Sequence, residues 1–282
     1  MSLKPFKSIG IGVAFSPNLK ANLFEAARLS VFFGAKLFLI HVGEASDDKT
    51  EKLSAILKTF EKDQLEYEVV FKTGDPVNVI LSTTEEKHID LLILGAVQRE
   101  RFVKYYVGSI ARKITRQAKC SVLLLIKPSV KRVPCEHIVV NGLKDPKTEQ
   151  TITSAFYVAK QLNSKKVTIV EEIKQDQISV KVDDDKSLRR ATIMKERIKL
   201  RENSRIKEII NHIPEAYTES KTIKLQPIFG KQGYSIGHYA QISRADLLVM
   251  NAPAKMTFWD RLFPHDIEHI LTELPTDVLI LQ

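Results

Sequence analysis

Two hydrophobic patterns alternate along the chain. Short apolar runs bounded by turn residues are followed by longer stretches in which apolar residues recur every three or four positions. Runs of the first kind are typical of buried strands, and stretches of the second kind are typical of amphipathic helices. Their alternation predicts an α/β protein in which βαβ units build open parallel sheets with helices on both faces.

The first half of the chain predicts one complete set of five strands. The apolar runs cover residues 9–15, 37–42, 65–71, 91–94 and 122–126. The first helix expected between them runs from Asn18 to Phe33 and is closed by Gly34. The next three are expected to begin at a cap at Asp47 or Asp48, at the turn Gly74-Asp75-Pro76, and at Ser109.

The second half repeats this order of strands and helices. Asp246 and the four apolar residues after it match Asp90 and its followers, an offset of 156 that also pairs residues 122–125 with 278–281. Further upstream an offset of 153 pairs Leu53 with Ile206. The repeat predicts two tandem domains of the same five-stranded fold, residues 1–128 and 134–282, joined by a short proline-containing stretch.

The last strand of each half is uniformly apolar, over residues 122–126 and 278–281. An exposed apolar edge strand is a template for aggregation, so each must be paired or covered. We therefore predict that the two strands pair and that the halves pack as a pseudo-dimer about an approximate two-fold axis.

Charge is concentrated in an insertion that the first half lacks, residues 171–202. The formal net charge is +9, and residues 186–207 contain nine Lys or Arg against Glu196 and Glu202, which gives +7. Asp183 to Asp185 can cap one long helix here. Two interpretations remain open: a solvated helix face, or a docking surface for an acidic partner.

Composition narrows the class of protein. Hydrophobic residues make up 44% and charged residues 27% of the 282 positions, and no apolar run approaches the roughly 20 residues of a membrane helix. Cys120 and Cys135 are too few for a disulfide framework. We expect a cytoplasmic protein with no membrane span and no signal peptide.

One loop has the residues of a phosphate site. Gly95 and Gln98 follow the strand 91–94, and after a stretch of nine further residues Gly108-Ser109 opens a helix. Glycines let backbone N–H groups approach a phosphate, and a helix N-terminus adds free donors and a positive dipole end. Ordinary turn and capping chemistry explains the same residues, so this pattern alone leaves both interpretations open.

The stretch 90–126 resembles the C-terminal signature of the universal stress protein family, G-2x-G-9x-G-[S/T]. Gly95, Gly108 and Ser109 stand at motif positions, whereas Gln98 stands where the family has its second glycine. The resemblance implies a pocket for ATP or another adenine nucleotide, with phosphates on this loop and the adenine near the ends of the first two strands.

The resemblance transfers only in part to the rest of the pocket. Ala14 stands where nucleotide-binding members have an aspartate that reads adenine, while Ser16 and Val42 match positions near the base. The expected nucleotide-binding residues are Ser16, Val42, Gly95, Gln98, Gly108 and Ser109. The second half has Asn251, Ala254, Pro264 and His265 at the motif positions, and Asp145 near the first strand; we expect it to bind no nucleotide.

Enzymatic chemistry finds little support in the sequence. His265 to His269 has the H-x-x-E-H order of one class of zinc peptidases, but the repeat places it on an ordinary helix without a third ligand. No P-loop or nucleophile elbow occurs. We predict no catalytic residue and no metal ligand.

The sequence thus favours a non-catalytic, universal-stress-type regulatory or scaffold module with a degenerate adenine-nucleotide site in its first domain. The alternative is an interaction protein that binds no ligand and uses the basic insertion to engage an acidic protein, nucleic acid or an anionic membrane surface. An ATP-hydrolysing enzyme ranks third. Expected partners are the chain itself, within the tandem or as a homodimer, and an acidic protein rather than nucleic acid.

Overall fold

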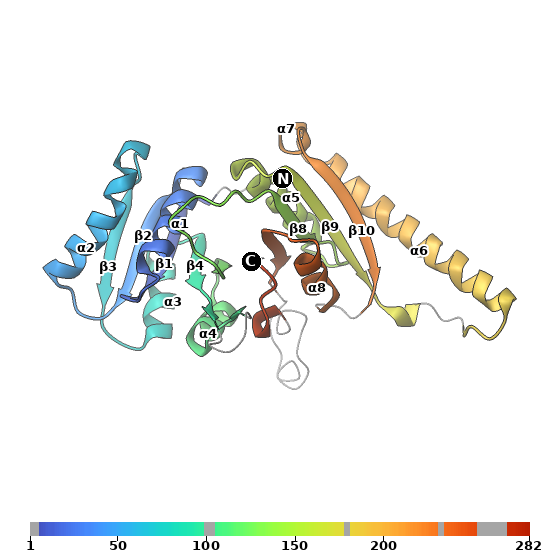
Figure 1. The fold of residues 1–282 in the computed structure, drawn as a ribbon, viewed down its shortest axis with the longest axis horizontal. Helices are drawn as coiled ribbons and strands as arrows, with labels where there is room; N and C mark the ends of the chain where they lie inside the picture. The colour runs from blue at the N-terminus through green and yellow to red at the C-terminus, as the bar shows by residue number, and fades with distance from the viewer. Residues whose placement is uncertain (1–5, 99–104, 178–180, 231–233, 253–269) are drawn as a thin grey trace. The chain divides into compact units, whose positions relative to one another are not determined.

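The computed structural model describes residues 6–98, 105–177, 181–230, 234–252 and 270–282. The chain divides into two compact units (Figure 1), which are described one at a time. Unit 1 comprises residues 1–134 together with 271–282, and unit 2 comprises residues 135–270.

Unit 1 is an α/β layer built on a mostly parallel sheet with the strand order β12-β7-β4-β1-β2-β3. Its parallel strands are β1 (Ser8–Val13), β2 (Lys36–Val42), β3 (Tyr67–Lys72), β4 (Leu91–Gly95) and β7 (Ser121–Leu125). Its helices are α1 (Leu19–Phe33), α2 (Asp47–Leu57) with the 3₁₀ turn η1 (Lys58–Asp63), α3 (Pro76–Glu86) and α4 (Ser109–Gln117). A two-stranded ribbon of β5 (Val97–Gln98) and β6 (Tyr105–Tyr106) follows β4.

Unit 2 has the same order of strands and helices. Its described strands are parallel, in the order β10-β9-β8-β11: β8 (His137–Asn141), β9 (Lys166–Ile173), β10 (Thr222–Phe229) and β11 (Leu247–Asn251). Its helical segments are α5 (Thr148–Gln161), η2 (Gln175–Gln177), α6 (Asp185–Asn211), α7 (Glu215–Thr218) and α8 (Tyr234–Ile242). In both units the chain reverses direction across the sheet after its third strand, so right-handed crossovers place the first two helices on one face and the next on the other.

Local sequence explains most helix boundaries. Gly34 ends α1 in the left-handed conformation at φ 62°, and the Asp75 carboxylate accepts a hydrogen bond from the Asn78 N–H at the start of α3. The cap predicted at Asp47 or Asp48 is wrong. Ser46 has the extended backbone that an N-cap needs, and its hydroxyl accepts from the Lys49 N–H.

The duplication read from the sequence extends to contacts inside each unit. The Asp90 carboxylate accepts the N–H groups of Lys7 and Ser8 at 3.0 and 3.1 Å. The Asp246 carboxylate accepts those of Glu136 and His137 at 2.8 and 2.9 Å. In both units, therefore, an aspartate before the fourth strand fixes the start of the first strand.

The final strand of the chain, β12 (Asp277–Leu281), belongs to unit 1 and pairs antiparallel with β7. Leu279 lies opposite Leu123, and the Asp277 carboxylate accepts a hydrogen bond from the Ile126 N–H at 2.8 Å. The predicted pairing of the two apolar edge strands is confirmed. The two-fold arrangement of the halves stays a prediction.

The insertion forms the long helix that the sequence predicts. The α6 helix has 27 residues, and Asp184 and Ser187 form a capping box at its start. Residues 171–173, in contrast, belong to β9. Among the described residues, no helix is long and apolar enough to cross a membrane. Cys120 and Cys135 form no disulfide in this structure.

Candidate functional site: the carboxyl edge of the unit 1 sheet

The order of strands in unit 1 indicates which edge of its sheet can hold a ligand. Strand order reverses between β1 and β4, because β2 and β3 extend the sheet on one side of β1 and β7 extends it on the other. In open parallel sheets the ligand crevice lies outside the carboxyl ends of the strands at such a switch point. Here those ends are Val13, Val42 and Gly95.

An aromatic cluster surrounds the ends of β1 and β2. The His41 ring packs edge to face against Phe15 and Phe71, with centroids 4.9 and 5.7 Å away. His41 Nδ1 lies 3.0 Å from the Val13 carbonyl, which fixes it as the protonated nitrogen because a carbonyl only accepts. The Lys52 ammonium lies 5.7 Å from the Phe15 ring centroid. This cluster occupies the strand ends where the resemblance places a base.

A polar group that the sequence analysis missed lies beside the glycine of β4. A Cβ added to Gly95 would lie 3.6 Å from the Asn22 Oδ1, so the bare glycine backbone faces the amide on the first turns of α1. That oxygen is buried and accepts no hydrogen bond within the described part of the chain. A buried acceptor without a partner is costly, so this amide is suited to a ligand donor.

The start of α4 presents unused backbone donors. Gly108 is its N-cap, with φ −59° and ψ 161°, and no side chain caps the helix. Ser109 is exposed at the first helical position. Among the described residues, the Gly108 N–H has no acceptor. Free N–H groups at a helix N-terminus, together with the helix dipole, favour an anion.

The C-terminal segment of unit 1 fixes the backbone just before this helix. The Val107 N–H donates to the Leu271 carbonyl at 3.1 Å, and the Leu274 N–H donates to the Tyr105 carbonyl at 3.0 Å. Gln98 pairs with Tyr105 in the small ribbon through its backbone. Residues 99–104, which join the two ribbon strands, lie outside the described residues.

The six predicted residues fall into two groups. The first group lies around β1. Val42 and Gly95 end the strands β2 and β4 on either side of β1, and Ser16 follows β1 in the loop to α1. Gly108 and Ser109 start α4, on the element that follows the loop 99–104, and Gln98 stands at the beginning of that loop. Among the described residues, no hydrogen bond joins the two groups.

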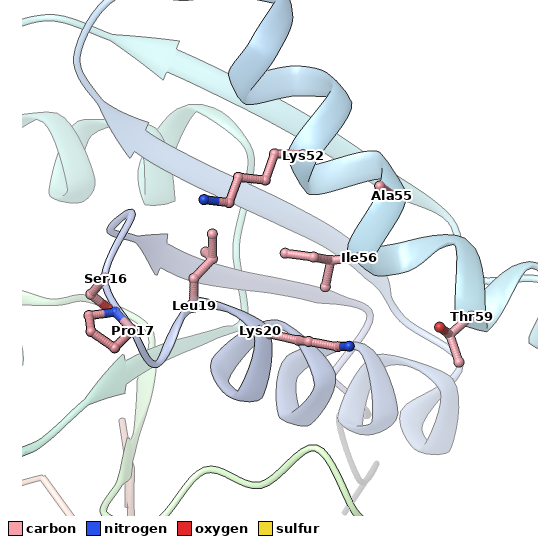
Figure 2. A pocket seen from close by; sticks show the side chains of 8 residues that line it. All are labelled: Ser16, Pro17, Leu19, Lys20, Lys52, Ala55, Ile56 and Thr59. Carbon is pink, nitrogen blue, oxygen red and sulfur yellow. The ribbon is translucent and has the colours of Figure 1, made fainter.

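A hollow of about 520 Å³ lies between α1 and α2 (Figure 2), and of the six predicted residues only Ser16 lines it. The other lining residues are Pro17, Leu19, Lys20, Lys52, Ala55, Ile56 and Thr59. In the figure, the side chains of Lys52 and Lys20 extend into the space between the two helices. The hollow beside the N-terminal end of α1 is therefore lined by two ammonium groups and by apolar side chains.

The equivalent edge of unit 2 is filled by its own side chains. By the strand registers, Gly142 corresponds to Val13 and Glu171 to His41. Arg205, on α6, donates to the Gly142 carbonyl at 2.6 Å and to the Glu202 carboxylate at 2.9 Å. The offset of 153 makes Arg205 the counterpart of Lys52, so a basic side chain reaches the strand ends in both units.

Glu171 is the unusual residue of this second edge. Its side chain is buried, and neither carboxylate oxygen has a hydrogen-bond partner among the described residues. Burial raises the pKa of this carboxyl to about 7, opposed by the charge of Arg205 and reinforced by that of Glu202. A carboxyl with this pKa keeps its proton in about half of the molecules at neutral pH, whereas an ordinary glutamate is almost fully ionised there.

Other candidates from the second half have structural roles or lie outside the described residues. The Asp145 carboxylate accepts the Lys147 N–H at 2.8 Å and so serves its own loop before α5. Asn251 ends β11. The motif positions Ala254, Pro264 and His265, with the H-x-x-E-H sequence, fall in 253–269, which the structure does not describe. No group of metal-binding side chains occurs in the described ranges.

Comparisons with known proteins identify relatives of this architecture. The family model described as "Universal stress protein family" matches residues 5–125. A universal stress protein of Helicobacter pylori is 28% identical over 109 residues, which cover 36% of this chain and 78% of that protein.

Two solved structures match the chain over almost its whole length. A universal stress protein from Archaeoglobus fulgidus is 15% identical with a TM-score of 0.66, and the match covers 98% of each chain. A functionally unknown protein from Pseudomonas aeruginosa is 17% identical with a TM-score of 0.70, covering 98% of this chain and 92% of that one. These likenesses show a shared fold over almost the whole chain, and the family match identifies residues 5–125 as a domain of the universal stress protein type.

Proposed function

We propose that this protein is a non-catalytic regulatory or scaffold protein that binds one adenine nucleotide, at the carboxyl edge of the unit 1 sheet. The observation that carries the proposal is the juxtaposition of Gly95 with the Asn22 Oδ1, which has no hydrogen-bond partner among the described residues, at the point where the strand order reverses. A ligand donor placed there, a ribose hydroxyl or the adenine amine, satisfies that oxygen.

The phosphates belong at the start of α4 in this proposal. The Gly108 N–H has no acceptor within the described residues, and Ser109 offers both its N–H and its hydroxyl. Phosphate oxygens are strong acceptors and are stabilised by the positive end of a helix dipole. The resemblance of residues 95–109 to the family motif supports the same placement.

Weak binding is expected because the site has lost two groups. Ala14 supplies no carboxylate to read the adenine, and Gln98 replaces a glycine that lets the backbone approach a phosphate. Each lost hydrogen bond removes about 0.5–1.5 kcal/mol, so the dissociation constant moves from a micromolar toward a high micromolar value.

A regulatory role without turnover is supported by the chemistry of the described residues at this edge. Ser16, Asn22, His41 and Ser109 include no carboxylate that could hold Mg²⁺ or activate water for phosphoryl transfer. His41 uses Nδ1 on the Val13 carbonyl. Burial raises the pKa of the Cys120 thiol to about 11, which leaves it protonated and unreactive at neutral pH.

The experiment identifies the ligand directly. Protein purified rapidly at low temperature is denatured with acid, and the released nucleotides are identified by mass spectrometry; we expect AMP, ADP or ATP. Calorimetry then compares the wild type with Asn22→Ala, which is expected to bind about 2- to 10-fold more weakly. Gln150→Ala, an exposed amide on α5 of unit 2, is the control. No adenine nucleotide bound at millimolar concentration contradicts the proposal.

A further inference from the structure

The outer face of α6 exposes a group of arginines together with two large apolar side chains. Residues seven apart lie on the same side of an α-helix. Ala191 and Ile198 form the buried side, which packs toward the sheet along β10. Ile193 and Leu200 lie on the opposite side, 53% and 64% exposed. Two large aliphatic side chains therefore stand one heptad apart in solvent.

Arginines surround these two apolar residues. Arg189, Arg190 and Arg197 are three or four positions from Ile193, which makes them its neighbours on the helix surface, and Arg197 is also three positions from Leu200. Arg201 lies four positions beyond Arg197 and is paired with Glu202 at 3.1 Å. Within the described part of the chain, Arg189, Arg190 and Arg197 have no carboxylate partner. We call this set the arginine face: Arg189, Arg190, Ile193, Arg197, Leu200 and Arg201.

The arginine face is also held in place. The helix begins at the Asp184–Ser187 capping box, and its inner side is anchored by buried Ala191, Ile198 and Ile206. The Arg205 side chain bonds the Gly142 carbonyl at the far end of the helix. Because the helix is ordered before any partner arrives, binding costs little backbone entropy.

We propose that the arginine face docks an acidic helical segment of a partner protein, one that sets an apolar side chain between flanking glutamates or aspartates. The planar guanidinium group matches carboxylates bidentately, and Ile193 and Leu200 supply the apolar centre of the contact. This inference is independent of the nucleotide site in unit 1.

Three other occupants fit the face less well. A nucleic acid backbone offers phosphates to the arginines but no apolar side chain to Ile193 and Leu200, so the centre of the face stays unpaired. Glu196, on the same side, is paired with Lys199 at 2.8 Å. An interfacial membrane helix needs a broad apolar face, whereas this one has two apolar residues among charges. A second copy of this chain carries the same net charge of +9 and is repelled.

The test measures binding of a fluorescein-labelled three-heptad peptide in which glutamates flank leucines, by fluorescence anisotropy with the full-length protein. The face variant carries Arg189→Glu, Arg190→Glu and Arg197→Glu. The matched variant makes the same change in net charge at exposed lysines elsewhere, Lys58→Glu, Lys62→Glu and Lys113→Glu. An apolar variant carries Ile193→Ser and Leu200→Ser. Far-ultraviolet circular dichroism verifies that each variant is folded.

We expect the face variant to bind the peptide at least tenfold more weakly, the apolar variant several-fold more weakly, and the matched variant within about twofold of the wild type. Affinity should fall as salt rises. Equal losses in the face and matched variants would show general charge attraction and overturn the proposal. Tighter, face-dependent binding of duplex DNA or phosphatidylserine vesicles than of the peptide would overturn it as well.

Discussion

Single positions show how the two units diverged after duplication. His41 in unit 1 sits in an aromatic cluster and bonds a strand-end carbonyl, whereas its counterpart Glu171 is buried without a hydrogen-bond partner. Arg205 lies near that carboxyl but uses its donors on Gly142 and Glu202. The second edge is therefore closed by internal contacts and carries an uncompensated acid.

Glu171 makes the stability of unit 2 depend on pH. Its pKa is raised from 4.5 to about 7 in the folded protein, so the folded state holds the proton more tightly than the unfolded state. The contribution of this proton to the free energy of unfolding is fully present below about pH 4.5 and is lost as the pH rises through about 7. The loss is on the order of 3 kcal/mol. Glu171→Gln should remove this dependence and be more stable than the wild type at pH 8.

Urea unfolding of both proteins at pH 5 and pH 8 measures this effect. The urea midpoint of the wild type should drop between the two values more than that of the variant. Glu208→Gln, which changes an exposed acid on α6, is the control. A variant no more stable than the wild type at pH 8 would show that Arg205 already neutralises the carboxylate.

At the level of elements, most of the structure follows from local sequence. The apolar run 91–94 and the turn Gly74-Asp75-Pro76 predicted β4 and α3, because a continuous buried run and a capped proline leave few alternatives. The cap of α2 was predicted wrongly since Ser46, Asp47 and Asp48 are all good capping residues. The ribbon of β5 and β6 has two-residue strands, too short for any periodicity.

Removing the true cap tests this correction. Ser46→Ala removes the hydroxyl that accepts the Lys49 N–H and should lower the free energy of unfolding of unit 1 by about 0.5–2 kcal/mol. Asp47→Asn only weakens a charge–dipole interaction and should cost less, about 0.3–1 kcal/mol. Denaturant melts of the two variants are compared with the wild type. A larger loss of unfolding free energy in Asp47→Asn than in Ser46→Ala would show that Asp47 is the cap.

At the scale of the whole molecule, the last strand completes unit 1 from the far end of the chain. Val278, Leu279 and Ile280 are buried against β7. A protein truncated before Asp277 exposes the apolar edge of β7, and we expect it to self-associate. Light scattering at increasing concentration should show aggregates for the truncated protein and none for a chain that lacks only Gln282. A monodisperse truncated protein would show that this edge is covered by another segment.

The candidate site was only partly predictable from the sequence, because some of its contacts join distant parts of the chain. The motif spacing located Gly95, Gly108 and Ser109, because those roles depend on the backbone of a single loop. Asn22 and Arg205 matter because of contacts between elements that are distant in the sequence. Asn22 faces Gly95 from α1, and Arg205 on α6 donates to the Gly142 carbonyl at the end of a strand. Spacing along the sequence carries no signal for either contact.

The most direct test of the account is the number of nucleotides bound per chain. Calorimetric titration with ADP and ATP should give one site in the wild type. Gly108→Pro keeps the observed φ of −59° but removes the N–H without an acceptor, so it should weaken binding at least tenfold while the fold persists. Arg205→Ala, which opens the unit 2 edge, should leave the stoichiometry at one. Two equivalent sites, or binding that Gly108→Pro does not change, would contradict a single site in unit 1.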